Sequence, residues 1–435
     1  MGGINGFFIS ILQGIHSFVG NYGWSVVLFT LLIRFILLPL DIKQRKSMRA
    51  MQKIQPMQME LQRKYGRDQE KYNKKLQELY RKENVKPLAG CLPMLISFPL
   101  LIIMFSAMRN LASEQSARML LNLVQSMPAL SDGSSVQAAI SAIQIDLSAL
   151  SITPEQLDAI LQGLTLSAEQ VQAVTDLATV ALSPSQITAL SGLLTSEQAV
   201  LVTEQMELFL SGITLTAQQA QTVASGIEFE SWLWIKNVFN PDSFMNSILP
   251  AARAVTQDNA SILSSLQLTP ISGSEVLTEE NLQVIASFLK TPAYASIAQA
   301  LGADDFIRIP LNLVFFQPTL TLPTSFEALF SSANGLFILP LFAALSQVFM
   351  TKVLAPKQQN APADAANAQQ NPMNGAFMKW FMPLLSLWWC AGYNAAFAIY
   401  WCAVNVIQIV QNFFINRYFE RKDRMAAEAA QIENK

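Results

Sequence analysis

Five stretches of this chain are apolar over roughly the length that a helix needs to cross a lipid bilayer, and this constrains the fold more than any other feature. They cover residues 24–40, 91–108, 336–353, 377–390 and 395–415. A spanning helix needs about 20 mostly apolar residues, because each residue adds only about 1.5 Å along the axis. We therefore predict an all-α polytopic membrane protein with five transmembrane helices.

The composition agrees with a membrane protein and limits the chemistry. Apolar residues make up 51% of the chain and charged residues 14%, whereas soluble domains carry about 25% charged residues. Cys91, Cys390 and Cys402 all lie in apolar stretches, which argues against a disulfide framework or a cysteine zinc site. His16 is the only histidine, so a multi-histidine metal site is excluded, and we expect neither a metal nor a cofactor.

The charges of the loops set the orientation of the spans. Residues 41–90 carry 14 Lys and Arg against 6 Asp and Glu, a net charge of +8. Residues 110–334 carry 5 Lys and Arg against 20 Asp and Glu, a net charge of −15. Because basic loops stay in the cytoplasm, we expect a multi-pass protein of the inner (plasma) membrane, with its N-terminus and the acidic segment outside and its C-terminus inside.

Two shorter features complete the predicted topology. Gly392-Tyr393-Asn394 interrupts the last apolar stretch, which predicts a tight turn between the fourth and fifth spans. Residues 1–20 carry apolar side chains at a spacing of three to four, so we expect an amphipathic helix in the outer interface, with a removed leader peptide as the alternative. The expected domains are 1–20 (interfacial helix), 21–110 (first two spans and their loop), 111–334 (external segment), 335–416 (last three spans) and 417–435 (cytoplasmic tail).

The cytoplasmic loop has the pattern of a helical hairpin over residues 42–83. One amphipathic helix is expected from about 42 to 65 and a second from about 68 to 81, with Gly66 as the break and Asp68 as the N-cap. The methionines either line the inner seam or offer an adaptable surface to apolar peptides. The basic side chains form a solvated face or bind lipid headgroups or ribosomal RNA. The candidate contact residues are Lys43, Arg45, Lys46, Met48, Met51 and Met57.

Arg34 is the most informative single residue, because it lies inside the first predicted span, about 9 Å from its cytoplasmic end. A charge at such a depth costs at least about 2.5 kcal/mol and normally faces a hydrated cavity or an acidic partner. None of the other four spans contains Asp or Glu. We therefore expect Arg34 to face a protein-lined groove rather than to form an ion pair between spans.

Neutral polar side chains in the other spans are candidates for the walls of this groove. In the last span, positions 401, 405, 408 and 412 share one helical face. Such side chains either form hydrogen bonds between helices or line a polar groove, and the buried arginine favours the groove. Besides Arg34, the predicted groove residues are Thr30, Ser97, Gln347, Tyr400, Trp401, Asn405 and Gln408.

Several short motifs occur together along the chain. They are the first span from Asn21 to Pro39, the loop beginning Lys43-Gln44-Arg45-Lys46, Pro87-Leu-Ala-Gly-Cys-Leu-Pro93, Trp232-Leu-Trp-Ile-Lys236, Asn240-Pro-Asp242, Met382-Pro383, Tyr400-Trp401 and Asn405. In combination they resemble the YidC/Oxa/Alb family of membrane protein insertases. The chain departs from the family pattern at Asn394-Ala395-Ala396, where Pro-Ala-Gly is usual, and at Ser97, where glutamine is common.

The resemblance implies a five-span bundle around a positively charged groove that opens to the cytoplasm and to lipid. Arg34 takes the place of the family's groove arginine. The implied function is insertion and folding of new membrane proteins, with no catalytic residue and no enzyme activity. The implied partners are nascent membrane proteins and the bilayer, with a Sec-type translocon, the ribosome and the signal recognition particle pathway as further candidates, and no DNA.

The external segment is rich in helix-start signals. A Thr or Ser followed three residues later by Gln, the pattern of a capping box, occurs at 153–156, 167–170, 183–186, 195–198 and 216–219, twice with proline at the first helical position. We predict short stacked helices in an all-α accessory domain, with residues 150–227 folding on their own. This domain is either a structural spacer or a surface that binds clients or a translocon.

Two other functions compete with insertion. A small-solute transporter or channel, the main alternative, predicts paired ionisable residues at mid-membrane and an internal repeat of spans, and neither occurs here. A rhomboid-like serine protease needs a serine and a histidine inside the spans, whereas His16 lies outside them. We therefore predict an insertase.

Overall fold

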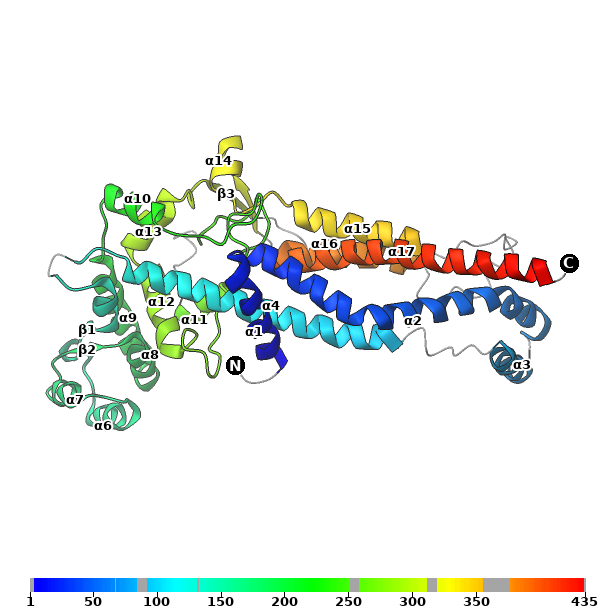
Figure 1. The fold of residues 1–435 in the computed structure, drawn as a ribbon. Helices are drawn as coiled ribbons and strands as arrows, with labels where there is room; N and C mark the ends of the chain where they lie inside the picture. The colour runs from blue at the N-terminus through cyan, green and yellow to red at the C-terminus, as the bar shows by residue number, and fades with distance from the viewer. Residues whose placement is uncertain are drawn as a thin grey trace. The chain divides into compact units, whose positions relative to one another are not determined.

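The computed structural model describes residues 4–66, 68–83, 92–130, 133–250, 258–310, 319–354 and 376–433. The described chain is mostly helical, as predicted, and falls into two compact units (Figure 1). The core unit comprises residues 7–108 and 337–435, and the inserted unit comprises residues 1–6 and 109–336. Two of the three boundaries between the units lie within two residues of positions 110 and 335, and the third lies between residues 6 and 7.

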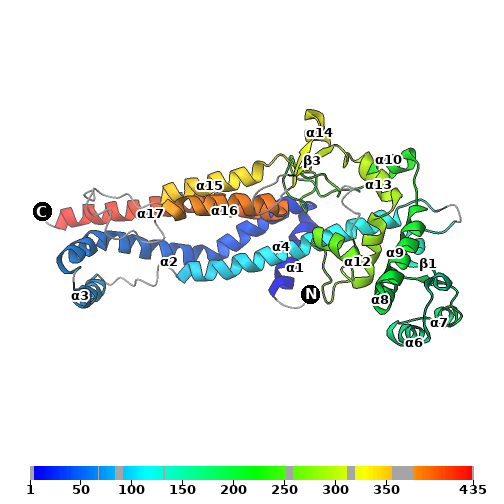
Figure 2. The same cartoon turned by 180° about the vertical axis from the view of Figure 1, so that it is seen from behind.

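Long helices make up the core unit. They are α1 (Ile4–Val19), α2 (Tyr22–Tyr65), α3 (Gln69–Lys82), the first half of α4 (Leu92–Gln125), α15 (Ile338–Leu354), α16 (Ala376–Gly392) and α17 (Ala395–Glu433). α15, α16 and α17 lie side by side, and α17 also packs along α2 (Figure 2).

α2 joins the first predicted span and the first helix of the hairpin into one helix of 44 residues. It begins at the N-cap Asn21, whose side chain accepts a hydrogen bond from the Trp24 backbone N–H, and it continues through Pro39 and Pro56. The prediction of two separate helices, one on each side of residue 41, was therefore wrong. A proline inside a helix removes one backbone hydrogen bond, and here the flanking residues continue the helix.

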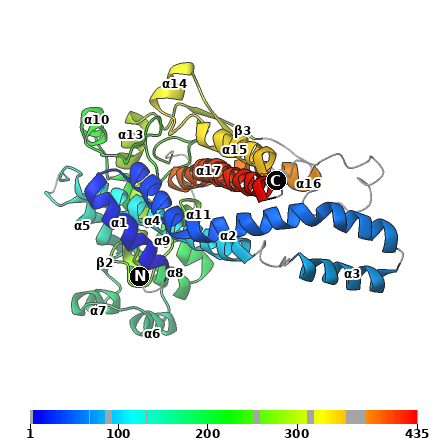
Figure 3. The same cartoon turned by 45° about the vertical axis from the view of Figure 1, so that its right-hand side comes forward.

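The end of the hairpin follows the prediction. Gly66 ends α2, and the Asp68 side chain caps α3 by accepting a hydrogen bond from the Lys71 backbone N–H. α3 folds back against the last turns of α2 (Figure 3).

The turn between the last two helices also lies where the sequence places it. α16 ends at Gly392 and α17 starts at Ala395. The Asn394 side chain accepts a hydrogen bond from the Phe397 backbone N–H over 3.0 Å, which satisfies one of the free donors at the start of α17. α17 then continues as a helix to Glu433, through most of the predicted cytoplasmic tail.

Aromatic contacts and short polar contacts hold the core unit together. The Phe105 ring of α4 lies 4.1 Å from the Tyr393 ring and 5.4 Å from the Phe397 ring, measured between centroids. Cys402 of α17 donates a hydrogen bond to the Leu339 carbonyl of α15 over 3.5 Å. These contacts fix α4, α15 and α17 against one another without charged groups.

Two described helices are long and apolar enough to cross a bilayer, over residues 22–51 in α2 and 395–425 in α17. The apolar part of α15, Ile338–Met350, is shorter. The count of five spans remains a prediction.

The inserted unit is built from short helices and two small sheets. Its elements after α4 are α5 (Val136–Ser141), β1 (Ile143–Asp146), the 3-10 helix η2 (Leu147–Leu150), α6 (Pro154–Gly163), α7 (Ala168–Thr175), β2 (Thr179–Leu182), α8 (Pro184–Leu193), α9 (Ser196–Ser211), α10 (Ala217–Ser225), α11 (Asn259–Ser265), α12 (Glu279–Leu289), α13 (Pro292–Ala300), β3 (Phe306–Pro310), β4 (Thr319–Pro323) and α14 (Phe326–Ser331).

All five predicted capping boxes are confirmed, at the starts of α6, α7, α8, α9 and α10. The capping glutamines also join helices to each other. Gln186 of α8 donates to the Thr165 carbonyl over 2.7 Å and to the Gln170 side chain of α7 over 3.2 Å. Gln156 of α6 donates to Gln198 of α9 over 2.7 Å. A local helix signal thus also contributes to the packing of the unit.

The independent folding of residues 150–227 remains a prediction. Their buried side chains belong to one hydrophobic core that runs from Ala117 in α4 to Ala303 and also includes α11–α13. The external segment is mostly helical, with two short sheets that the sequence analysis did not predict: β1 pairs antiparallel with β2, with Ile143 opposite Leu182, and β3 pairs with β4. The strands are only four or five residues long, too short for alternation of side chains to signal them clearly.

We predict that Gln186→Ala loosens α7 and α8. The substitution removes the bond to the Ser183 backbone N–H as well as those to Thr165 and Gln170, which should lower local stability by about 1–2 kcal/mol. Hydrogen exchange of the full-length protein should then show about tenfold faster exchange across residues 165–193. The exposed Gln218 of α10 provides the matched control, and equal exchange in Gln186→Ala and Gln218→Ala would contradict the prediction.

Candidate functional site

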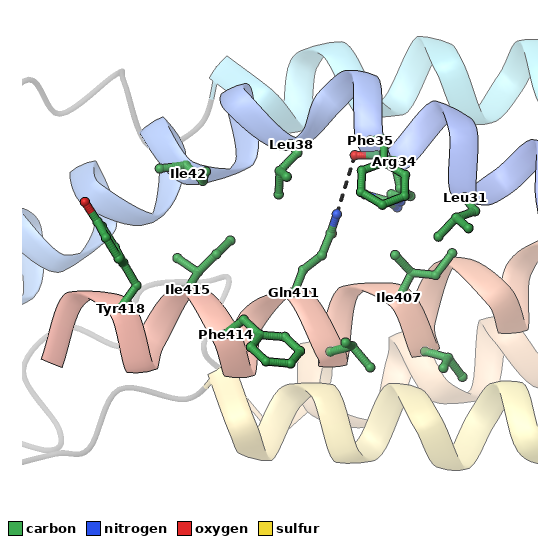
Figure 4. Close-up of a pocket in the computed structure, with 12 residues that line it drawn as sticks. Leu31, Arg34, Phe35, Leu38, Ile42, Ile407, Gln411, Phe414, Ile415 and Tyr418 are labelled. Carbon is green, nitrogen blue, oxygen red and sulfur yellow. Dashed lines mark hydrogen bonds between the residues drawn. The ribbon is translucent and has the colours of Figure 1, made fainter. Parts of the chain in front are cut away.

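A cavity of about 620 Å³ lies between α2 and α17 of the core unit (Figure 4). Its walls are mostly aliphatic and aromatic, and Arg34 and Gln411 are the polar groups among them apart from the Tyr418 hydroxyl. The lining residues are Leu31, Arg34, Phe35, Leu38, Ile42, Val406, Ile407, Val410, Gln411, Phe414, Ile415 and Tyr418. Arg34 therefore brings a charge to the wall of an otherwise apolar cavity.

Two glutamines of α17 hold the Arg34 segment of α2. With its amide oxygen turned toward Arg34, Gln408 accepts hydrogen bonds of 2.9 Å from both terminal guanidinium nitrogens. Gln411 donates to the Arg34 backbone carbonyl over 3.4 Å (Figure 4).

The positive charge of Arg34 is held by a neutral amide and lies within electrostatic range of two further groups. Tyr400 of α17 and Asp41 of α2 both interact with it electrostatically. Asp41 lies seven residues further along α2, two turns away on the same face. Asp41 was not among the predicted partners of Arg34, because it lies just beyond the apolar stretch of the same helix and not in another span.

The other predicted groove residues whose side chains the structure describes are not among the residues that line this cavity. Thr30 is buried and donates to the Val26 carbonyl of its own helix over 2.6 Å. Asn405 is buried and donates to Ser346 of α15 over 2.8 Å, so it takes the alternative role of a hydrogen bond between helices. Gln408 reaches the site through Arg34.

Three further predicted groove residues lie elsewhere in α15 and α17. Tyr400 is buried, and its ring packs against Phe397. Trp401 packs against Trp389, and its buried indole N–H has no hydrogen-bond partner in the described part of the chain. Gln347 of α15 is half-buried.

Two predicted site side chains cannot be placed. Ser97 belongs to helix α4 and Met48 to helix α2. The structure describes the backbone of these two residues but not their side chains.

The predicted cytoplasmic contact residues lie on the surface of the hairpin to different degrees. Lys43, Lys46 and Met57 are exposed, whereas Arg45 and Met51 are half-buried. Met57 therefore does not belong to the inner seam. Next to it, Gln58 donates to the Tyr80 hydroxyl of α3 over 3.2 Å. Burial, followed by the influence of Tyr72, raises the pKa of Tyr80, which keeps its hydroxyl neutral.

Arg49 connects the hairpin to the end of α17. Its guanidinium donates to the Asn416 carbonyl over 3.3 Å, lies 3.5 Å from the Asp423 carboxylate, and stacks over the Phe419 ring at 5.0 Å from the centroid. We call these four residues the Arg49 clamp. The clamp was not predictable from the sequence, because the partners of Arg49 lie about 370 residues away, at the end of the last predicted span and in the predicted tail.

The sequence matches a known family profile over most of its length. The sequence profile described as 60Kd inner membrane protein matches residues 14–206 and 205–422. The chain belongs to this family. The resemblance to YidC-type insertases is thereby confirmed, and members of the 60Kd inner membrane protein family are not enzymes.

Curated relatives of the 60Kd inner membrane protein family carry the name membrane protein insertase YidC. One from Fusobacterium nucleatum is 43% identical over 104 residues, 24% of this chain and 51% of that protein. One from Caldanaerobacter subterraneus is 40% identical over 110 residues, 25% and 53% of the two proteins. One from Clostridium perfringens is 40% identical over 126 residues, 27% and 53%. The chain spans about half the length of these relatives.

We predict that Arg49→Ala frees the hairpin from α17. It removes a stacking contact and a partly exposed ion pair, together worth about 1 kcal/mol, so hydrogen exchange across residues 42–65 should accelerate about fivefold. Arg49→Lys keeps the positive charge but loses the planar stacking, so its rate of hydrogen exchange should lie between those of the wild type and Arg49→Ala. Lys46→Ala, an exposed basic residue one turn away, is the control. Unchanged exchange in Arg49→Ala would show that the clamp does not hold the hairpin.

Proposed function

We propose that this protein is a membrane protein insertase in which Arg34 and the apolar walls around it receive part of an entering client. The observation that carries the proposal is a guanidinium placed by Gln408 at the edge of a 620 Å³ apolar cavity between two helices long enough to span a bilayer. Family membership and the name of the curated relatives support the same function.

The size of the cavity limits what it can receive. A helix about 10 Å across would fill 620 Å³ over roughly 8 Å of its length, or about five residues. A complete client span therefore does not fit between α2 and α17. We infer that the cavity takes the leading turn of a client, while the rest of the apolar segment moves along the lipid-facing side of the two helices.

The chemistry of the walls suits two parts of an entering peptide. Arg34 attracts acidic or carbonyl groups of the polar flank, since an ionic interaction is strong where water is scarce. Leu31, Ile407 and Val410 offer apolar contact to the segment that follows. Moving that segment into lipid is favourable by about 0.8 kcal/mol for each CH₂ group, so the reaction needs no covalent step.

The hairpin supplies the surface that a cytosolic client meets first. Its exposed Lys43, Lys46 and Met57 combine positive charge with a flexible apolar side chain. We propose that nascent membrane proteins and the lipid bilayer are the partners of this surface, with the ribosome, the signal recognition particle pathway and a Sec-type translocon as further partners. The topology that accompanies the proposal has five spans, the N-terminus outside and the C-terminus in the cytoplasm.

We predict that the field of Arg34, rather than its shape, supports insertion. Arg34→Ala should slow insertion of a short client with an acidic outer tail about tenfold, a loss of about 1.4 kcal/mol. Gln408→Glu keeps the arginine and the size of its partner but pairs the charge, and should slow insertion to a similar extent. Gln408→Leu adds no negative charge but removes the group that positions Arg34, and should therefore retain more activity than Gln408→Glu. The measurement is protease protection of the client in proteoliposomes.

Two results would count against this proposal. Full activity of Arg34→Ala with several acidic-tailed clients would remove the role of the charge. Activity of Gln408→Glu equal to wild type would show that the net charge at this position is irrelevant. The transporter alternative is tested separately, since it predicts flux of small solutes through the purified protein in sealed vesicles.

A further inference from the structure

The inserted unit carries an apolar surface that its own core does not cover. Ile307 and Ile309 of β3 are 53% and 41% exposed, and Phe326 and Phe330 of α14 are 79% and 53% exposed. We call these four residues the β3–α14 patch. Clusters of exposed apolar side chains on a folded domain usually mark an interaction site.

The strand register gathers the apolar residues of the hairpin on one face. Ile307 pairs with Leu322, and Ile309 pairs with Leu320. Directly opposed residues of an antiparallel pair lie on the same face of the sheet, so these four aliphatic side chains form one apolar face. None of them belongs to the hydrophobic core of the inserted unit. A two-stranded sheet with such a face is marginal in water unless something covers it.

α14 presents its aromatic pair in a similar way. Phe326 and Phe330 are four residues apart and lie on one side of the helix, and their rings meet edge to face with centroids 5.1 Å apart. Ala328, on the opposite side, is buried. α14 packs beside β4, which pairs with β3, and α14 and β3 lie close together in Figure 1. The helix is thus anchored by one face and exposes its two large aromatic side chains on the other.

We propose that the β3–α14 patch rests in the headgroup region of the lipid bilayer and attaches the inserted unit to the membrane surface. The proposal rests on α15 being a membrane span, as in the function proposed above. Phe330 precedes the start of α15 by eight residues, so the chain limits their separation to at most about 28 Å. α15 itself exposes the apolar side chains of Leu341, Leu345 and Phe349.

The charges of the patch favour lipid over a charged partner. Within β3, β4 and α14 the charged residues are Arg308 and Glu327, one of each sign. Electrostatic attraction to anionic headgroups therefore contributes little, and attachment depends on burying apolar and aromatic side chains at the interface. The patch should consequently bind to zwitterionic lipid, and salt should not weaken the contact.

The experiment measures how close the patch lies to lipid in the full-length protein. The three native cysteines are replaced by alanine, and a fluorophore is attached to Phe326→Cys. The labelled protein is reconstituted in phosphatidylcholine vesicles that contain a nitroxide-labelled lipid as quencher. Leu208→Cys in α9 is the matched control, because Leu208 is a 75% exposed apolar residue of the same unit outside the patch. Leu345→Cys in α15 reports whether that helix lies in the membrane.

We expect quenching of the Phe326 label at least threefold stronger than that of the Leu208 label, and equal at 0.1 and 1 M salt. Equal weak quenching at Phe326 and Leu208, with strong quenching at Leu345, would overturn the membrane contact and leave the span intact. Weak quenching at Leu345 would instead contradict the span and the proposed function. If the Phe326 label were protected from a water-soluble quencher in native membranes but not in vesicles of pure lipid, a protein partner would cover the patch. This result would overturn the proposal.

Discussion

The account of this protein depends on the electrostatic cost of placing one guanidinium in an apolar wall. Moving a charge out of water is expensive, and proteins normally offset the cost with an opposite charge or with several hydrogen bonds. Here Gln408 accepts two hydrogen bonds through a single neutral oxygen, so it positions Arg34 without adding a negative charge next to it. A carboxylate in the same place would neutralise the guanidinium and weaken its electrostatic field in the cavity.

This requirement accounts for the pairing of α2 with α17. Gln408 and Gln411 both come from α17, one contacting the Arg34 side chain and the other its backbone. Further along the same pair of helices, the Arg49 clamp repeats the contact with Asn416, Phe419 and Asp423. The same two helices therefore position Arg34 and, further along, the helical hairpin.

Local signals were predictable from the sequence, and contacts between distant segments were not. The capping boxes at Thr153 and Ser183 depend on residues three apart, and the structure confirms them. The spacing of Asn405 and Gln408 predicts that they share one face of α17, but it could not show that the first bonds to Ser346 of α15 and the second to Arg34 of α2. The continuity of α2 through Pro39 was missed, because the cost of an internal proline is decided by the packing around it.

The most direct test of the central role of the cavity is site-specific photocrosslinking to a stalled client. A photoreactive amino acid is placed at Leu38, which lines the cavity, and at Leu345, which faces outward from α15 with 66% exposure. Ribosomes carrying a client stalled with its apolar segment just emerged are then added to membranes containing each variant. The account predicts a strong crosslink from Leu38 to the leading turn of the client and a weak one from Leu345. Crosslinking from Leu345 alone would place the client elsewhere and contradict the account.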